Sequence, residues 1–124
     1  MEGVSDNKTL GMRGEEIALQ FLKKLRFRVL ETNYRCKCGE IDIIARDGSE
    51  LVFVEVKTRR TSSYGPPQLS VTPFKQRQIS KVALTWLSKN GLMEKNARFD
   101  VIGVLLRDNG PLVEHINNAF DLAY

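Results

Sequence analysis

The stretch GEIDIIARDGSELVFVEVKT, at residues 39–58, determines the central part of the fold. Residues 40–45 and 50–58 are rich in β-branched and apolar side chains, and the Asp-Gly pair at 47–48 is a typical hairpin turn, so two antiparallel strands are predicted. The second strand has apolar residues on both faces, with Phe53 on one and Val54 on the other. Because such a strand needs cover on both sides, we expect 50–58 to lie at the centre of a sheet.

The residues before this stretch predict a helix followed by a further strand. Apolar residues recur at steps of three and four between Ala18 and Leu25, which indicates an amphipathic helix over 10–25. Residues 27–35 are rich in Val, Tyr, Phe and Thr and predict a strand. Residues 1–9 are polar and show no period, so they are predicted to form a flexible leader outside the core.

The residues after it predict a loop, a second helix and a further strand. Residues 58–70 contain glycine, two prolines and no period, and are expected to form an exposed, mobile loop. Thr72 is a suitable helix cap with proline at the first helical position, and Gly91 ends the apolar repeat. Residues 98–106 predict a strand, and a shorter extended segment is expected over 112–116.

This order of elements predicts the fold class. The sequence α-β-β-β-α-β, with a central strand covered on both faces, indicates an α/β protein built as a three-layer sandwich around a mixed β-sheet. A length of 124 residues suits one domain with its own core, so we expect a single domain over 1–124.

The composition restricts the class of protein without naming a function. The hydrophobic fraction of 42% and charged fraction of 27% are ordinary for a globular protein. The net charge of +4 and the sequence pI near 9.2 favour contact with phosphate backbones. No apolar run approaches the roughly 20 residues of a membrane span, and the N-terminus has no apolar signal segment, so we expect a cytoplasmic protein without a membrane partner.

The two cysteines, Cys36 and Cys38, are separated by a single residue. This spacing is poor for a mutual disulfide and supplies only half the ligands of a structural zinc site. We expect two reduced thiols near a strand end, with a soft-metal site shared between two copies of the chain as the alternative.

Charged residues interrupt the apolar pattern of the two central strands. Because side chains alternate along a strand, Glu55 and Lys57 point to one face. With 47–48 as the turn residues, pairing outward places Glu40 opposite Glu55 and Asp42 on the same face. Three carboxylates and a lysine are therefore predicted to crowd together on a largely apolar surface.

Such crowding requires compensation, because carboxylates resist desolvation and repel one another. A hard divalent cation meets this need, so we predict a Mg²⁺ site, with Mn²⁺ as the alternative, formed by Asp42, Glu55 and Glu40. Mg²⁺ polarises a phosphodiester and acidifies a bound water, while Lys57 orients that water or stabilises developing charge. The predicted reaction is phosphodiester hydrolysis. The same spacing also fits a solvated strand end at which Asp42 makes a surface ion pair.

Four further residues lie where they would meet this site or its substrate. Glu15 falls on the apolar face of the first helix, whereas Glu16 falls on the polar face. Lys75 lies on the inner face of the second helix near its N-terminus, where the helix dipole also favours an anion. Arg59 and Arg60 directly follow the central strand, where they could bind a nucleic-acid backbone. Helix-boundary positions for Glu15 and Lys75, and an ordinary basic loop, are the alternatives.

Two other polar groups are assigned no catalytic role. Arg98 and Asp100 open the last strand and are expected to form a structural ion pair at the sheet edge. His115 is the single histidine and has no partner motif.

The strings GEIDIIA at 39–45 and FVEVKTR at 53–59 resemble the PD-(D/E)XK nuclease signature, and their setting resembles the uncharacterised YraN family of bacterial proteins. Gly14-Glu15 in the first helix, Lys75 in the second and RFDV at 98–101 extend the resemblance. It implies a restriction-endonuclease-like fold, related to archaeal Holliday junction resolvases.

The same resemblance implies roles for individual residues. Asp42 and Glu55 would be metal ligands, Lys57 the catalytic lysine and Glu15 an auxiliary acid. The chain departs from the family pattern in the Cys-Lys-Cys insertion before Gly39, and in Gln68, where an acidic residue is expected.

Two functional hypotheses follow from the sequence. The first is a metal-dependent endonuclease that hydrolyses DNA, on branched substrates in recombination or repair. A junction-resolving enzyme needs two sites, which would favour a homodimer. The second is a non-catalytic nucleic-acid-binding or adaptor protein with a nuclease-like fold.

Overall fold

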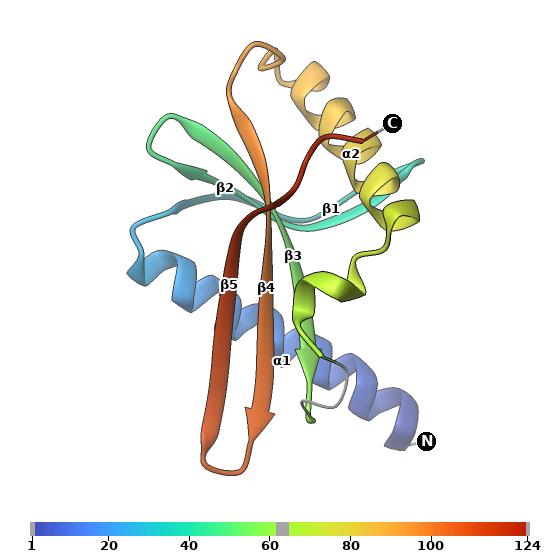
Figure 1. The fold of residues 1–124 in the computed structure, drawn as a ribbon, viewed down its shortest axis with the longest axis vertical. Coiled ribbons are helices and arrows are strands. Elements are labelled where there is room, and N and C mark those ends of the chain that lie inside the picture. Colours follow the sequence, from blue (N-terminus) through green and yellow to red (C-terminus); the bar gives the residue numbers. More distant parts are fainter. Residues whose placement is uncertain (1, 62–64, 124) are drawn as a thin grey trace.

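A mixed five-stranded sheet lies between two helices in the computed structural model, which describes residues 2–61 and 65–123 (Figure 1). The sheet order is β1-β2-β3-β4-β5, with β3 and β4 parallel and every other neighbouring pair antiparallel. The elements in chain order are α1 (Glu2–Lys24), β1 (Arg28–Cys36), β2 (Gly39–Asp47), β3 (Glu50–Arg59), the 3₁₀ helix η2 (Pro67–Ser70), α2 (Pro73–Lys89), β4 (Ala97–Arg107) and β5 (Gly110–Phe120). The predicted α/β sandwich around a mixed sheet is confirmed.

Two apolar cores lie on opposite faces of β3. The core under α2 contains Phe53 and Trp86, and the core under α1 contains Leu22 and Val54. All four side chains are at most 5% exposed. The prediction that 50–58 forms a central strand with cover on both faces is therefore confirmed. Within the described residues, neither helix has the length and hydropathy of a membrane span.

The strand pairing in the β2–β3 hairpin differs by two residues from the predicted register. Asp47 pairs with Glu50, so the two loop residues are Gly48 and Ser49. Gly48 has a φ of +63°, and glycine at the first loop position is typical of a type II′ turn. The predicted pairing of Glu40 with Glu55 is therefore wrong. A shift by an even number of residues preserves which side chains share a face.

The two ends of the chain also differ from the sequence prediction. Helix α1 begins at Glu2, so the prediction that the first helix starts near Leu10, after a flexible leader, is wrong for residues 2–9, and Met1 lies outside the described residues. This segment contains no proline, and extending an established helix requires no new nucleation step. Strand β5 is a complete strand where only a short segment was expected. It lies at the sheet edge, which tolerates proline and polar side chains.

The segment predicted as one mobile loop over 58–70 is only partly a loop. Strand β3 continues to Arg59, and Pro67–Ser70 forms η2. Pro67 is buried against Gly103 of β4, where a Cβ on the glycine would lie 2.3 Å from the proline ring. Residues 62–64 lie outside the described part of the chain.

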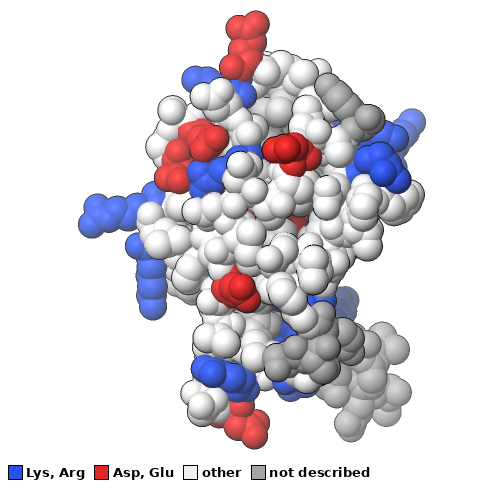
Figure 2. Space-filling view, in the orientation of Figure 1, with Lys and Arg blue, Asp and Glu red and all other residues white. Residues whose placement is uncertain are grey.

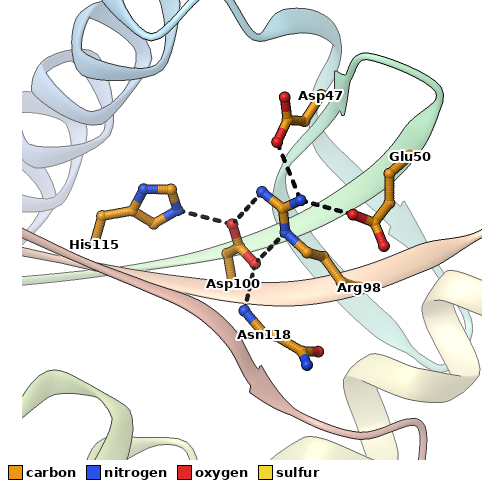
Figure 3. A network of polar contacts seen from close by, with 6 residues as sticks. All are labelled: Asp47, Glu50, Arg98, Asp100, His115 and Asn118. Carbon is orange, nitrogen blue, oxygen red and sulfur yellow. Dashed lines mark hydrogen bonds and ion pairs between the residues drawn. The ribbon is translucent and has the colours of Figure 1, made fainter.

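A buried polar network joins the start of β4 to β5 and to the β2–β3 hairpin (Figure 3). Asp100, which is fully buried, accepts hydrogen bonds from the Arg98 guanidinium at 3.0 Å and from the Asn118 backbone N–H at 2.9 Å. His115 Nε2 lies 2.7 Å from the other carboxylate oxygen. Arg98 also contacts Glu50 at 2.8 Å, among other partners. The expected structural ion pair between Arg98 and Asp100 is confirmed. Its carboxylate also contacts His115, to which the sequence analysis assigned no role.

Removing the central charge of this network should destabilise the fold. Burial acts to raise the pKa of Asp100, but the hydrogen bonds from His115 and Arg98 outweigh it and hold that pKa below its usual range. We expect Asp100→Asn to cost about 3 kcal/mol at pH 7, because Arg98 would lose a buried partner. The cost should disappear as the pH falls through the pKa of the folded state. Urea unfolding of both proteins between pH 7 and pH 3 measures it. Asp108→Asn, at an exposed turn, is the control, and equal effects would contradict the structural role.

Gly14 allows α1 to approach β3 closely. A Cβ at this position would lie 1.8 Å from Thr58 Oγ1, whereas a Cβ at Gly11 would meet nothing within 4 Å. The two glycines lie one turn apart in the same helix, so they differ mainly in this contact.

Gly14→Ala should therefore separate the helix from the sheet. We expect it to lower the free energy of unfolding by about 2 kcal/mol through overpacking. Gly11→Ala should leave stability unchanged or raise it by up to about 1 kcal/mol, as alanine favours a helix. Urea unfolding of both variants tests the contact. Equal behaviour of the two would show that α1 does not pack at this distance.

Candidate active site

The sheet divides in the middle of β2, and this division creates the site. Pairing between β2 and β3 runs from Asp47–Glu50 to Ile43–Val54. Beyond that point β2 stays with β1 as far as Gly39, while β3 stays with β4 as far as Arg59. The two strands therefore separate at the positions that carry Asp42 and Glu55.

The Asp42 side chain supplies β3 with a hydrogen-bond acceptor at the point where β2 no longer pairs with it. Its Oδ2 accepts a hydrogen bond from the Val56 backbone N–H at 2.8 Å. The inward–outward alternation of β2 also slips here, because Ile41 packs in the core under α2 and Ile43 in the core under α1. This irregularity directs the Asp42 carboxylate into the opening between the strands.

Glu55, which is buried, and Asp42, which is half-buried, form a carboxyl pair joined by a hydrogen bond. The Glu55 side chain is only 11% exposed. Burial, followed by the charge of Asp42, raises the pKa of Glu55 to about 8. Burial also raises the pKa of Asp42, against the lowering effect of the hydrogen bond from Val56. At neutral pH the pair therefore retains a proton that two separate carboxyls would have released.

Two lysines lie beside the carboxyl pair. Lys75 of α2 places Nζ 3.7 Å from Glu55 Oε2. Burial, followed by the charge of Lys75, lowers the pKa of Lys57. Lys57 is half-buried and is the next residue along β3 on the same face as Glu55. A lysine in these surroundings gives up a proton more readily than one in water.

Glu15 reaches the site from α1, as its position on the apolar helix face predicted. Asn33 of β1 donates a hydrogen bond to Glu15 Oε1 at 2.8 Å. Burial, and then the charges of Asp42 and Glu40, act to raise the pKa of Glu15. The sequence gave no signal for Asn33, although its φ of +53° is a conformation that asparagine adopts more readily than most residues.

A cleft of about 840 Å³ opens between α1 and the diverging strands. Asp42 and Lys57 line it from the sheet, and Glu15 and Met12 line it from α1. Glu55 does not line this cleft, and its carboxylate lies beside Lys75 of α2. The cleft therefore gives solvent access to the carboxyl pair at Asp42.

Glu40 does not join the carboxyl pair. Its carboxylate contacts Arg35 at 3.3 Å on the surface of the β1–β2 hairpin. Among the described residues, no three acidic, cysteine or histidine side chains converge as a ready-made metal cage. Asp42 and Glu55 are thus the pair that could hold a divalent cation, with water or substrate filling the remaining positions.

The basic residues predicted to bind nucleic acid are distributed around the site. Arg59 lies at the end of β3 and contacts the Ser70 hydroxyl of η2, while Arg60 is exposed in the bend that follows. On the face drawn in Figure 2, the described lysine and arginine side chains form separate groups towards the edges of the molecule. They make no continuous basic band across that face.

Three other predicted features lie outside the site. Cys36 and Cys38 are both free thiols, in agreement with the expected reduced pair. Gln68, at the position where the family resemblance calls for an acid, lies in η2. Its Oε1 is buried and has no hydrogen-bond partner among the described residues.

Comparison with known proteins identifies a family but no activity. The model of an uncharacterised protein family, UPF0102, matches residues 14–104, a range that includes Glu15, Asp42, Glu55, Lys57 and Lys75. The chain is 60% identical to UPF0102 protein GSU0650 from Geobacter sulfurreducens, over 99% of this chain and 97% of the relative. It is 65% identical to a UPF0102 protein from Geotalea daltonii, over 99% and 98% of the two chains. A third relative, from Pelobacter propionicus, is 66% identical over 96% and 87%.

The buried Glu55 should make the metal-free protein less stable as the pH rises. The unfolded chain ionises this group near pH 4.5, whereas the folded chain holds the proton to about pH 8, so unfolding is increasingly favoured across that window. We expect Glu55→Gln to match the wild type at pH 5 and to be more stable by about 2 kcal/mol at pH 8.5. Urea unfolding in EDTA measures the difference.

The matched control is Glu16→Gln, which changes an exposed glutamate on α1. Its difference from the wild type should not vary with pH over this range. A Glu55→Gln difference that is the same at both pH values would show that Glu55 ionises normally in the folded protein.

Proposed function

Because the chain belongs to the UPF0102 family, which is uncharacterised, we propose a function from the geometry of its own site: a metal-dependent endonuclease that hydrolyses DNA phosphodiester bonds. The observation that carries the proposal is the carboxyl pair of Asp42 and Glu55 beside Lys57. A fold requires no such pair at this position, since an apolar residue at 55 would continue the core stripe of Phe53.

The carboxyl pair fits a hard divalent cation. Two acids that share a proton at neutral pH can release that proton to water when a divalent cation binds in its place. Mg²⁺ typically keeps several waters and uses one or two protein carboxylates together with substrate phosphates, which matches a site with two acids and an open cleft. When bound, Mg²⁺ or Mn²⁺ would polarise the phosphate and acidify a water.

The remaining residues would act on the water and on the phosphate. Lys57 lines the cleft beside Asp42, where its ammonium can orient a water or stabilise charge that develops on the phosphate oxygens. Glu15, held by Asn33, faces the same cleft as an auxiliary acid that can accept a proton or bind a water. Lys75, adjacent to Glu55, adds positive charge on the α2 side of the carboxyl pair.

The basic residues near the site favour a nucleic acid as substrate. Arg59 and Arg60 follow the strand that carries Lys57, and Lys75 opens α2 next to it. Together these side chains could bind neighbouring phosphates of a nucleic-acid strand that passes the site. DNA, including branched DNA in recombination or repair, is the proposed substrate.

A second candidate is a binding or adaptor protein that does not cut. The observation in its favour is that Asp42, Glu55 and Lys75 already compensate one another through a hydrogen bond and an ion pair. Such a cluster is stable without metal. This candidate requires salt-sensitive nucleic-acid binding without metal-dependent cleavage.

A cleavage assay distinguishes the two candidates. The purified protein is incubated with linear duplex, single-stranded and four-way-junction DNA, with MgCl₂ or MnCl₂ or with EDTA. We expect metal-dependent cleavage that falls by a factor on the order of a hundred or more in Asp42→Asn, Glu55→Gln and Lys57→Ala. DNA affinity in EDTA should change little, because none of the three changes removes Arg59 or Lys75.

Exposed residues of the same types provide the controls. Asp108→Asn in the β4–β5 turn and Lys81→Ala on α2 should retain wild-type cleavage. Cleavage that persists in Asp42→Asn would reveal a contaminating nuclease, and DNA binding without any cleavage would establish the adaptor candidate. Mg²⁺ should also raise the melting temperature of the wild type at pH 8 and leave Glu55→Gln unchanged.

A further inference from the structure

Exposed apolar side chains lie close along the chain to Lys75, the α2 residue that contacts Glu55. Leu69 and Phe74, in the segment that joins η2 to α2, are 71% and 65% exposed. The residue after Phe74 is Lys75, which contacts Glu55. Met12, which lines the cleft from α1, is also 65% exposed. Phe74 is the one aromatic residue among the large hydrophobic side chains that are exposed in the described part of the chain, and an aromatic ring beside a cation offers a stacking surface.

The segment that carries Leu69 and Phe74 is firmly anchored. Pro67 and Val71 are buried, the latter only 2% exposed. Thr72 Oγ1 accepts the Lys75 backbone N–H at 3.2 Å, and Gln76 Nε2 donates to the Val71 carbonyl at 3.0 Å. Figure 1 shows this segment on the same side of the sheet as α2, next to the end of β3. The exposed side chains are therefore presented at fixed positions.

Cations accompany the aromatic ring on this surface. Lys75 and the exposed Arg77 belong to the first two turns of α2, and Arg59 contacts Ser70 just before it. A surface that combines cations with an exposed aromatic ring is typical of proteins that bind single-stranded nucleic acid, because phosphates pair with the cations and a base stacks on the ring. In an intact duplex every base already stacks on its neighbours, so only an unpaired base is available to Phe74.

We propose that Phe74, with Leu69 in the same anchored segment, stacks on an unpaired base next to a phosphate bound at Lys75. The preferred substrate is therefore DNA with unpaired bases at the cleavage point, such as a single strand, a flap or an opened junction. This inference rests on the proposed nuclease function for the position of the cut, but the stacking itself is independent of metal.

The stacking is tested first by fluorescence in EDTA, where no cleavage occurs. Trp86 is the single tryptophan and is buried, so Phe74→Trp adds one exposed reporter. We expect oligothymidine to quench the new emission and a duplex of the same length to leave it nearly unchanged. Met93→Trp is the matched control: Met93 is 54% exposed and follows the opposite end of α2, about 25 Å away along the helix. Quenching that is equal in both variants, or absent from both, overturns the proposal.

Affinity and cleavage provide the second test. Phe74→Ala should weaken oligothymidine binding roughly tenfold, and Phe74→Tyr, which keeps the ring, should restore it. With Mg²⁺, Phe74→Ala should reduce cleavage of single-stranded and flapped DNA more than cleavage of duplex. Equal loss on every substrate would show that Phe74 supports the fold or the site in general.

The outcomes separate this inference from the nuclease proposal. Selective quenching without any cleavage supports stacking and rejects the nuclease. Metal-dependent cleavage that is insensitive to Phe74 rejects stacking and keeps the nuclease. A second copy of the chain is the other occupant that could cover Leu69 and Phe74. Sedimentation velocity that shows a dimer dispersed by Phe74→Ala would assign the surface to that interface and overturn the proposal.

Discussion

The hydrogen bond from the Val56 backbone N–H to the Asp42 carboxylate holds β3 at the point where β2 leaves it. A central strand cannot leave a buried N–H without an acceptor, because the desolvation cost would approach that of a lost hydrogen bond. Once an acid occupies this position, the β3 residue that precedes Val56 lies beside a partly buried charge. In this protein that residue is Glu55, and its burial, followed by the charge of Asp42, raises its pKa to about 8. The geometry of the site therefore follows from the way in which the sheet divides.

The rest of the fold is arranged to maintain this division. The cores under α1 and α2 fix β3 from both faces, and the parallel ladder with β4 continues past the site to Arg59. The buried network around Asp100 fixes the start of β4 and the hairpin at the other end of β3. Gly14 lets α1 lie close enough for the following residue, Glu15, to reach the cleft. An unfavourable carboxyl pair persists because the surrounding structure leaves it no other arrangement.

Local patterns in the sequence predicted the elements and the choice of site residues. Alternation along β3 predicted both its central position and the shared face of Glu55 and Lys57, and helical periodicity separated Glu15 from Glu16. The sequence could not show that β2 slips at Asp42, because side-chain alternation assumes a regular strand. It also assigned the wrong turn residues, since Asp-Gly and Gly-Ser are both acceptable two-residue loops. Asn33 and His115 act through partners far along the chain, and no local pattern reports such contacts.

The distribution of charge around the pair also bears on what completes the site. Glu40 pairs with Arg35, so a bound cation would have the two carboxylates of Asp42 and Glu55 as ligands and its other positions open. Lys57 and Lys75 lie beside the carboxyl pair, where their positive charges would favour the binding of a phosphate. A site of this kind binds metal weakly by itself and more strongly with a polyanionic substrate in place, because each supplies what the other lacks. Recognition of the substrate and assembly of the reactive centre would then be one event, and the aromatic surface around Phe74 would act on both.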